Sequence, residues 1–475
     1  MTRLRVLLAA TGVAASFTVG VAQGGGPLDR AASAFRAGDI QSLGFDASGR
    51  YYQFGQAPAP ELPWPAFEVT DYTAEFDYAR QTVHARYRRV QVQEPGRARP
   101  PADQTMDQFA AGGVSWNLAP APTPMPTNLP ERNAEMWATP QGFVKAARAN
   151  HAVVKAAANG DATVTFTVDK VFRYEGLLNA AGDLVRVRTW LDSPVTGDTP
   201  AEWRLSDYRD FDGVRFPAHI ERAIAGLPWY DLRVTAVRIN AAAAVSVPPA
   251  IASAPAPVVT DVTTTEIAPG VVFLGGTTHN SVVVDQKNGL IVVEAPLTEP
   301  RSDAVIAKVR QLFPGRKIAG VINTHTHFDH AGGLRTYVAE GVPVITMARN
   351  AAYYTRAWAA PRTIGPDRLA KSRTAATFKT FDTKLVLPDA THPIEIHAIT
   401  GSGHNDAFAM IFLPRERLLI EADAWTPAAT PSATPSPLWL NLRDNIDRLH
   451  LDVQRIAPLH GTLQTIENLK TAIAR

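Results

Sequence analysis

The 475-residue chain contains no cysteine. It can therefore form no disulfide, and it has no thiolate that could bind a metal ion or carry a lipid anchor. Cysteine-free composition is compatible with an oxidising compartment, where structural thiols are usually paired. Any metal ligands in this chain must be of another type.

The chain also lacks a strongly apolar run of the roughly 20 residues that a membrane-spanning helix requires. Residues 1–5 are basic, residues 6–21 are apolar and rich in small side chains, and small residues surround Ala22. This pattern is typical of a signal peptide cleaved after Ala22. We expect residues 1–22 to be removed, no membrane span afterwards, and a periplasmic or secreted protein.

Charge of one sign is not in excess. The 47 Lys and Arg against 45 Asp and Glu give a net charge of +2, and the basic residues form no long block. No glycine-rich fingerprint for nucleotide phosphates is present either. Nucleic acid is therefore not an expected partner. A small-molecule substrate is expected instead, and the oligomeric state is not predicted.

The length favours two domains. Residues 241–257 contain eight alanines and four prolines and have almost no polar pattern, which is typical of a semi-stiff linker. We therefore predict one domain over residues 28–240 and a second over residues 258–475.

The first domain is predicted to be mostly antiparallel β structure. Short runs of alternating polar and apolar residues recur through it, and proline-rich loops are expected at 93–101 and 119–130. A helix is expected at 141–149, and strands are expected at 51–54, 72–78, 82–92, 162–168, 184–190 and 230–238.

Residues 208–217 read as a strand, an Asp-Gly hairpin and a second strand. This short segment resembles the same passage in the half-barrel domains of lipoprotein carriers. The resemblance implies a concave sheet that could hold apolar ligands. A purely structural or docking role as an accessory domain is an equally open interpretation.

Residues 323–333, Asn-Thr-His-Thr-His-Phe-Asp-His-Ala-Gly-Gly, carry the strongest chemical signal. In an extended segment His325, His327 and Asp329 face the same way, whereas His330 must point elsewhere unless the chain turns. Imidazole and carboxylate are the ligands of open catalytic zinc sites. This spacing suits two adjacent metal ions, one on His325 and His327 and the other on Asp329 and His330.

The surrounding sequence predicts an α/β domain. A buried strand is expected at 317–323 before the motif, and a helix at 334–340 after it. Further strands are expected at 271–274, 281–285 and 289–294, and helices after a cap at Ser302 and around 442–453. Strands and helices alternate, which predicts two sheets enclosed between helices.

The motif resembles that of the metallo-β-lactamase superfamily. The family's three other metal ligands have counterparts in this chain, in the same order along the sequence. They are His404 after a Gly-rich turn, Asp423 at the end of an apolar strand and His460 after a final strand. The resemblance implies an αββα sandwich and a catalytic role for Asp329. It also implies two Zn²⁺ ions, or other divalent transition metals, held by His325, His327, Asp329, His330, His404, Asp423 and His460.

The resemblance further implies hydrolysis by a metal-bound hydroxide. A histidine at position 327 differs from the glutamate of the redox flavodiiron branch, and a mononuclear iron dioxygenase branch fits an exported chain less well. Asp423 is shared with thioesterases, lactonases and phosphodiesterases, whereas secreted β-lactamases generally lack it. We therefore expect ester or lactone hydrolysis. The alternatives are a β-lactamase and a periplasmic binding protein with a vestigial metal site.

Several other residues are weaker candidates. Glu421 is a rival for the bridging position of Asp423, and His279 could contact substrate from a turn at the rim of the site. Tyr353 and Tyr354 could assist an oxyanion or pack a helix. The remaining candidates are a proline-rich stretch at 426–437 that could overhang the site and three histidines outside ligand positions, His392, His397 and His450.

Overall fold

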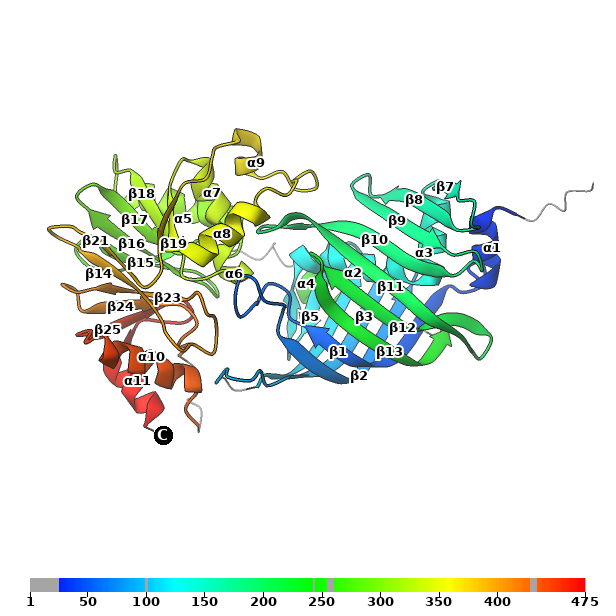
Figure 1. The fold of residues 1–475 in the computed structure, drawn as a ribbon, viewed down its shortest axis with the longest axis horizontal. Coiled ribbons are helices and arrows are strands. Elements are labelled where there is room, and N and C mark those ends of the chain that lie inside the picture. Colours follow the sequence, from blue (N-terminus) through cyan, green and yellow to red (C-terminus); the bar gives the residue numbers. More distant parts are fainter. Residues whose placement is uncertain (1–24, 99–100, 242–243, 254–259, 428–433, 475) are drawn as a thin grey trace, which may run out of the picture.

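The computed structural model describes residues 25–98, 101–241, 244–253, 260–427 and 434–474, which form two parts lying side by side (Figure 1). The predicted signal peptide and half of the proline-rich stretch after Asp423, residues 428–433, lie outside the described residues. Within the described ranges, no helix has both the length and the apolar character to span a bilayer.

The N-terminal part is built on one antiparallel sheet of thirteen strands, as the alternating pattern predicted. The sheet consists of two meanders joined where β1 pairs with β13, and its order is β6-β5-β4-β3-β2-β1-β13-β12-β11-β10-β9-β8-β7. The strands are β1 Ser42–Tyr52, β2 Ala66–Asp77, β3 Thr82–Gln91, β4 Asp103–Ala111, β5 Val114–Leu118, β6 Pro122–Pro124, β7 Val153–Ala156, β8 Ala162–Val168, β9 Phe172–Leu178, β10 Leu184–Ser193, β11 Gly197–Phe211, β12 Val214–Ile224 and β13 Leu227–Ile239.

Local sequence explains the turns and helices of this part. Asp212 and Gly213 both have positive φ, 53° and 82°, as the predicted hairpin between β11 and β12 requires. The helices α1 (Pro27–Ala34), α2 (Leu129–Ala138) and α3 (Pro140–Ala149) share one apolar core with the strands. Phe143 of α3 lies so close to Gly176 that a Cβ there would be 2.1 Å from its ring.

The prediction of a loop over 119–130 was partly wrong. Pro120 does lie in a loop, but Pro122 and Pro124 lie on the edge strand β6, Pro126 in the short 3-10 helix Pro126–Asn128 and Pro130 in the first turn of α2. Edge strands and first helical turns tolerate proline because neither position needs its missing N–H.

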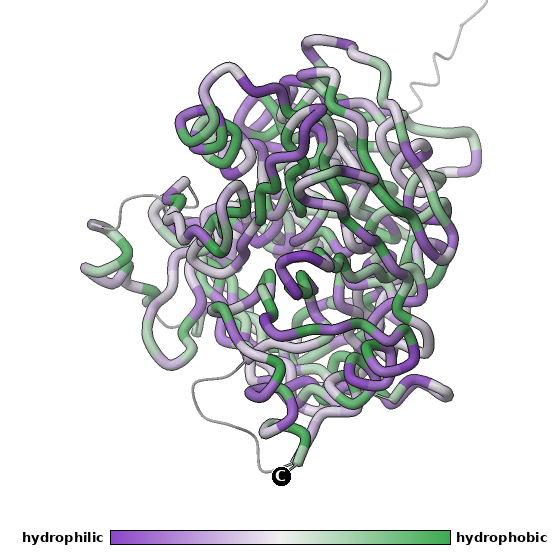
Figure 2. Tube along the Cα trace, turned by 90° about the vertical axis from the view of Figure 1, so that its left-hand side faces the viewer, coloured by the Kyte–Doolittle hydropathy of each residue, from purple (hydrophilic) through white to green (hydrophobic). Residues whose placement is uncertain are grey.

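The C-terminal part contains two sheets of seven and six strands packed face to face. Their facing apolar side chains form one core, and in Figure 2 hydrophobic segments run through the interior of this part. The first sheet comprises β14 Thr263–Ala268, β15 Val271–Gly275, β16 Ser281–Gln286, β17 Gly289–Val293, β18 Ile318–Ile322, β19 Val344–Met347 and β20 Phe378–Phe381. The second comprises β21 Lys384–Leu387, β22 Ile394–Ala398, β23 Ala409–Leu413, β24 Leu418–Glu421, β25 Arg455–Pro458 and β26 Gln464–Thr465.

Helices cover the outer faces, which confirms the predicted αββα sandwich. Beside the first sheet lie α5 Glu299–Leu312, α6 Phe328–Ala331, α7 Leu334–Ala339, α8 Ala348–Ala357 and α9 Arg368–Ser372; α10 Pro437–Arg448 and α11 Ile466–Ile473 pack against the second. The expected cap at Ser302 was wrong, because Pro300 occupies the first turn and Thr298 precedes the helix. Ser302 instead donates a hydrogen bond to the carbonyl of Gly333.

The segment between the two parts is not uniformly extended. A short helix, α4 (Pro249–Ala252), lies within the predicted linker. Its Ile251 is buried against Ala111 and Trp116 at the edge of the N-terminal sheet. This stretch of the linker is therefore docked onto the N-terminal part.

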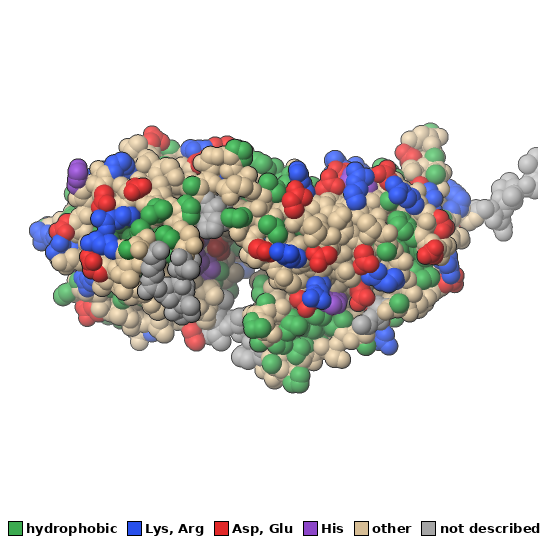
Figure 3. Space-filling model, turned by 90° about the horizontal axis from the view of Figure 1, so that it is seen from below, with side chains coloured by type: hydrophobic (Ala, Val, Ile, Leu, Met, Phe, Trp, Pro, Cys, Tyr) green, Lys and Arg blue, Asp and Glu red, His purple; other side chains and the backbone are tan. Residues whose placement is uncertain are grey.

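A loop of the N-terminal part, residues 53–65, reaches the C-terminal part. The strand expected over 51–54 ends at Tyr52, because Phe54 turns away to pack its ring against Phe328 at 5.0 Å. The carbonyl of Gly55 accepts a hydrogen bond from the Phe328 amide, and the carbonyl of Pro58 accepts one from Asp406. Figure 3 shows a hollow between the two parts, in which histidine and acidic side chains are visible.

Candidate metal centre

The histidine-rich loop follows β18 and then changes direction. Residues 323–327 form a loop, and the chain enters α6 at Phe328. The turn at this point separates His325 and His327 from Asp329 and His330. The two pairs accordingly belong to two different clusters, as the motif predicted.

The first cluster consists of His325, His327, His404 and Asp423. One potential ligand atom from each lies within 4.8 Å of all the others. The Nε2 atoms of His325 and His404 are 3.2 Å apart, and Asp423 Oδ2 lies 3.1 Å from the first and 3.2 Å from the second. The two histidines of the loop are buried, at 0% and 1% exposure.

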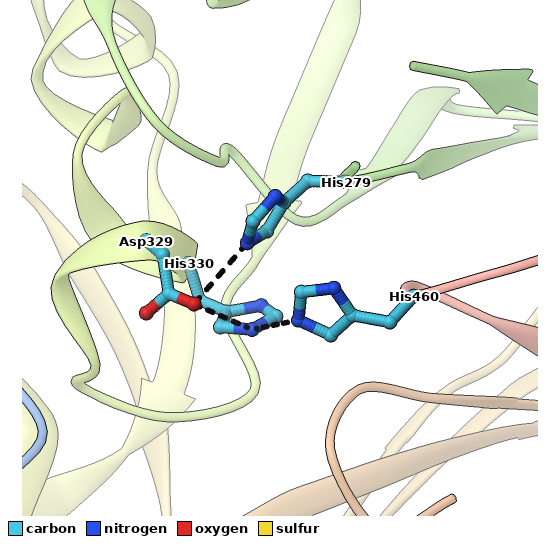
Figure 4. A group of neighbouring side chains, drawn as sticks. All are labelled: His279, Asp329, His330 and His460. Carbon is cyan, nitrogen blue, oxygen red and sulfur yellow. Dashed lines mark hydrogen bonds and ion pairs between the residues drawn. The ribbon is translucent and has the colours of Figure 1, made fainter. Parts of the chain in front are cut away.

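The second cluster consists of His279, Asp329, His330 and His460 (Figure 4). His330 Nε2 lies 3.0 Å from His460 Nε2, and His279 Nε2 lies 3.2 Å from Asp329 Oδ2. Asp423 reaches this cluster too, because its Oδ2 is 2.9 Å from His330 Nε2 and its Oδ1 is 2.9 Å from His460 Nε2. A single carboxylate therefore lies between the two clusters.

Hydrogen bonds on the far side of four of the rings fix which nitrogen faces the cluster. The outer ring nitrogens of three histidines lie beside oxygen acceptors: His330 Nδ1 beside Glu294, His460 Nδ1 beside the Thr278 carbonyl, and His327 Nε2 beside the Ala57 carbonyl. His325 Nδ1 donates to Thr324 Oγ1, whose own hydrogen goes to Glu294. In each neutral ring the opposite nitrogen then carries a lone pair directed into the cluster.

These lone pairs fit metal cations. Facing lone pairs 3.0–3.2 Å apart repel one another unless positive charge lies between them. Such separations match the edge of a tetrahedron with zinc–nitrogen bonds of about 2.0–2.1 Å, which is roughly 3.3 Å. Within the described part of the chain, His327 Nδ1 is buried without a hydrogen-bond partner. Asp423 Oδ2 lies within 3.2 Å of three imidazole nitrogens, but none of them donates to it with regular hydrogen-bond geometry. The residues therefore fit metal ions, and binding itself remains a prediction.

The pKa values within the clusters point to the same need for positive charge. Burial lowers the pKa of His325 to about 4, so this ring is a neutral potential ligand at physiological pH. Burial also opposes protonation of His330, but the carboxylates of Asp423 and Asp329 outweigh it and raise its pKa. Burial alone would raise the pKa of Asp423, but nearby His330 and His404 lower it, which keeps this carboxylate charged.

All seven residues predicted as ligands come together in these two clusters. His279 joins them, although its sequence position predicted at most a substrate contact. Glu294 was missed entirely: it lies at the end of β17, fully buried, and bonds His330, Thr324 and Asn323. Its only sequence signal was a lone carboxylate after an apolar strand.

The other weaker candidates are not members of the two clusters. Glu421 is buried and accepts a hydrogen bond from the Trp425 amide, so it does not replace Asp423 as a bridge. The Tyr354 hydroxyl donates to Asn323 behind the ligand loop, which is a supporting position. Tyr353 lines a small hollow beside Trp64 and Phe328. The other histidines lie elsewhere: His392 and His397 pair with Glu416 and Glu395, and His450 is exposed.

The N-terminal loop completes the surroundings of the clusters. The Ala57 carbonyl lies 3.0 Å from His327 Nε2 and also accepts a hydrogen bond from Asn405. Gln56 Nε2 donates to Asp329 Oδ1 over 2.8 Å. Two of the predicted ligands are thus held by residues that lie more than 250 positions earlier in the chain.

We expect the substitution Gln56→Leu to weaken metal binding at the second cluster by ~10-fold or more, because outer hydrogen bonds orient metal ligands. Competition with a chromophoric zinc chelator measures this affinity. The control is Gln53→Leu in the same loop. Equal affinities in Gln56→Leu and the unmodified protein would show that this hydrogen bond is irrelevant to the site.

Comparison with known proteins agrees with this geometry. A family model described as "Metallo-beta-lactamase superfamily" matches residues 274–460, which include the seven predicted ligands and His279. No curated protein matches the chain.

Solved structures similar to the C-terminal part include a metallo-β-lactamase from Pontibacter korlensis. Its identity to this chain is 15%, and the match covers 45% of this chain and 98% of that one, with a TM-score of 0.36. Another is the mono-zinc form of FIM-1 from Pseudomonas aeruginosa, with 19% identity, 45% and 93% coverage and a TM-score of 0.34. The family match and the sandwich of two sheets together place the C-terminal part of this chain in the metallo-β-lactamase superfamily of hydrolases, with its histidine and aspartate clusters as candidate metal sites.

Proposed function

We propose that the protein is an exported dinuclear-metal hydrolase that cleaves carboxylic esters or lactones. The observation that carries the proposal is the position of Asp423 between two clusters of converging imidazoles. The basic and then apolar sequence of residues 1–22 supports export to the periplasm or the medium.

Each cluster would hold one ion. His325, His327 and His404 would bind the first, Asp329, His330 and His460 the second, and Asp423 would contact both. Two Zn²⁺ ions held by these residues would supply an activated water at neutral pH and polarisation of the acyl oxygen. Asp329 remains ionised at neutral pH, because nearby His330 outweighs burial and lowers its pKa. An ionised Asp329 is suited to accept a hydrogen bond from the attacking water and to orient it.

The proposed preference for esters rests on Asp423. A carboxylate between the clusters adds negative charge and occupies a position that a β-lactam carboxylate or its departing nitrogen could otherwise use. An alkoxide departs more readily than an unprotonated amine, so esters demand less stabilisation of the leaving group. The family description keeps β-lactam hydrolysis as the second candidate.

We expect aryl esters and lactones to give higher kcat/KM values than nitrocefin, measured on the zinc-loaded full chain under identical conditions. An advantage of nitrocefin by about tenfold, equivalent to ~1.4 kcal/mol of transition-state preference, would reverse the assignment to a β-lactamase.

A further inference from the structure

A cavity of about 670 Å³ lies between the N-terminal and C-terminal parts. This volume is within the range of pockets that bind small molecules. The N-terminal sheet and its loop contribute Phe54, Leu191 and Trp229 to the wall, and the C-terminal part contributes Leu297, Thr298 and Thr336. Neither part alone encloses this space.

The cavity reaches the candidate metal centre at Asp329. This residue lines the cavity, and its side chain is 33% exposed, more than that of His330 or Asp423. Gly332, at the end of α6, lies on the same wall. A molecule in the cavity would therefore have one end beside the second cluster.

The aromatic section of the N-terminal wall is held in place, beside polar lining residues that include Glu131 and Asp192. The rings of Phe54 and Trp229 are stacked, with centroids 5.4 Å apart and planes 7° apart. The buried guanidinium of Arg222 lies 3.8 Å from the Trp229 ring and is itself paired with Glu131 at 2.7 Å. A stacked aromatic pair fixed in this way is a preformed surface for an apolar group.

The charges of the lining do not favour an anion. Arg335 is paired with Asp367 over 2.5 Å, and Arg362 lies near Asp367 at 3.4 Å and Asp192 at 3.9 Å. Glu299 adds a further negative charge. Thr298 and Thr336 add uncharged side chains to the lining. The lining therefore matches an uncharged molecule with an apolar body.

We propose that this cavity binds an uncharged apolar acyl chain of the substrate, so that the N-terminal part determines the chain length that the enzyme prefers. This inference rests on the proposed ester hydrolysis and extends it to a substrate class. It also assigns the N-terminal part a role in substrate binding.

The first test compares p-nitrophenyl acetate with p-nitrophenyl hexanoate on the zinc-loaded full chain. We expect kcat/KM to rise at least ~10-fold from acetate to hexanoate, since each buried methylene adds apolar contact. Leu191→Trp narrows the cavity, so the hexanoate-to-acetate ratio should fall ~10-fold. Leu118→Trp makes the same change at an exposed position outside the cavity and should leave the ratio unchanged. Phe172→Ser changes a partly exposed position of the lining and should also lower the ratio. This variant keeps the test decisive if Leu191→Trp fails to fold.

The second test measures binding without turnover. Calorimetry should detect binding of neutral hexanamide to the unmodified chain, weaker binding of hexanoate, and loss of hexanamide binding in Leu191→Trp but not in Leu118→Trp. Absence of hexanamide binding together with a flat chain-length profile would overturn the inference, even in an active esterase. Specific hexanamide binding without any ester hydrolysis would support the cavity as a binding site and overturn the proposed reaction.

Discussion

Replacing His325 with alanine is expected to reduce ester turnover at least ~1,000-fold, equivalent to ~4 kcal/mol of transition-state stabilisation. His325 is completely buried and contacts both His404 and Asp423. Its loss removes one predicted ligand from the first cluster and one of the histidines beside Asp423. The flanking strands should remain folded, because their apolar cores do not include this side chain. Turnover, bound zinc and circular dichroism measured on the same preparation check the three parts of this prediction.

A matched substitution controls for the loss of any histidine. His450 is exposed and has a positive φ of 53°, which asparagine tolerates, so His450→Asn should leave turnover and zinc content unchanged. A His325→Ala protein that kept a tenth or more of its activity while properly folded would remove His325 from the catalytic centre.

The second large effect is expected for Glu294→Ala. The Glu294 carboxylate is fully buried and accepts hydrogen bonds from the Asn323 amide group, the Thr324 amide and hydroxyl, and His330 Nδ1. Its removal leaves these donors buried without an acceptor, which should lower the free energy of unfolding by ~3 kcal/mol or more. It should also weaken metal binding ~10–100-fold, because His330 loses the group that orients it.

Urea denaturation and chelator competition measure the two consequences separately. Glu294→Gln keeps the side-chain volume and one acceptor, so its losses should be smaller than those of Glu294→Ala. Glu266→Ala, at an exposed position of β14, should change stability by no more than ~0.5 kcal/mol. A stable Glu294→Ala protein with unchanged zinc affinity would contradict the supporting role of this carboxylate.

Much of the C-terminal part could be predicted because its signals are local. The alternation of apolar strands and amphipathic helices predicted the sandwich, and the close spacing of His325, His327, Asp329 and His330 predicted two adjacent clusters. In a fully extended segment His330 would point away from Asp329. The chain turns into a helix at Phe328, and this turn brings the two residues into one cluster. The cap predicted at Ser302 was wrong, because the first helical turn tolerates proline and the helix therefore begins earlier, at Glu299.

What the sequence did not reveal depends on contacts between distant segments. The loop carrying Gln56 and Ala57 has no metal-binding pattern, and only the packing of the two parts brings it to Asp329 and His327. His279 lies in a turn whose position relative to β25 is fixed by the sheets: the Asn280 amide bonds the carbonyl of Leu459. Such contacts leave no periodicity or spacing in the chain that could predict them.

The metal content of the zinc-reconstituted full chain tests the central claim most directly. After excess metal has been removed by gel filtration, elemental analysis should give two zinc ions per chain, one for each cluster beside Asp423. Less than one zinc ion per chain would contradict the dinuclear centre and, with it, the proposed hydrolytic function.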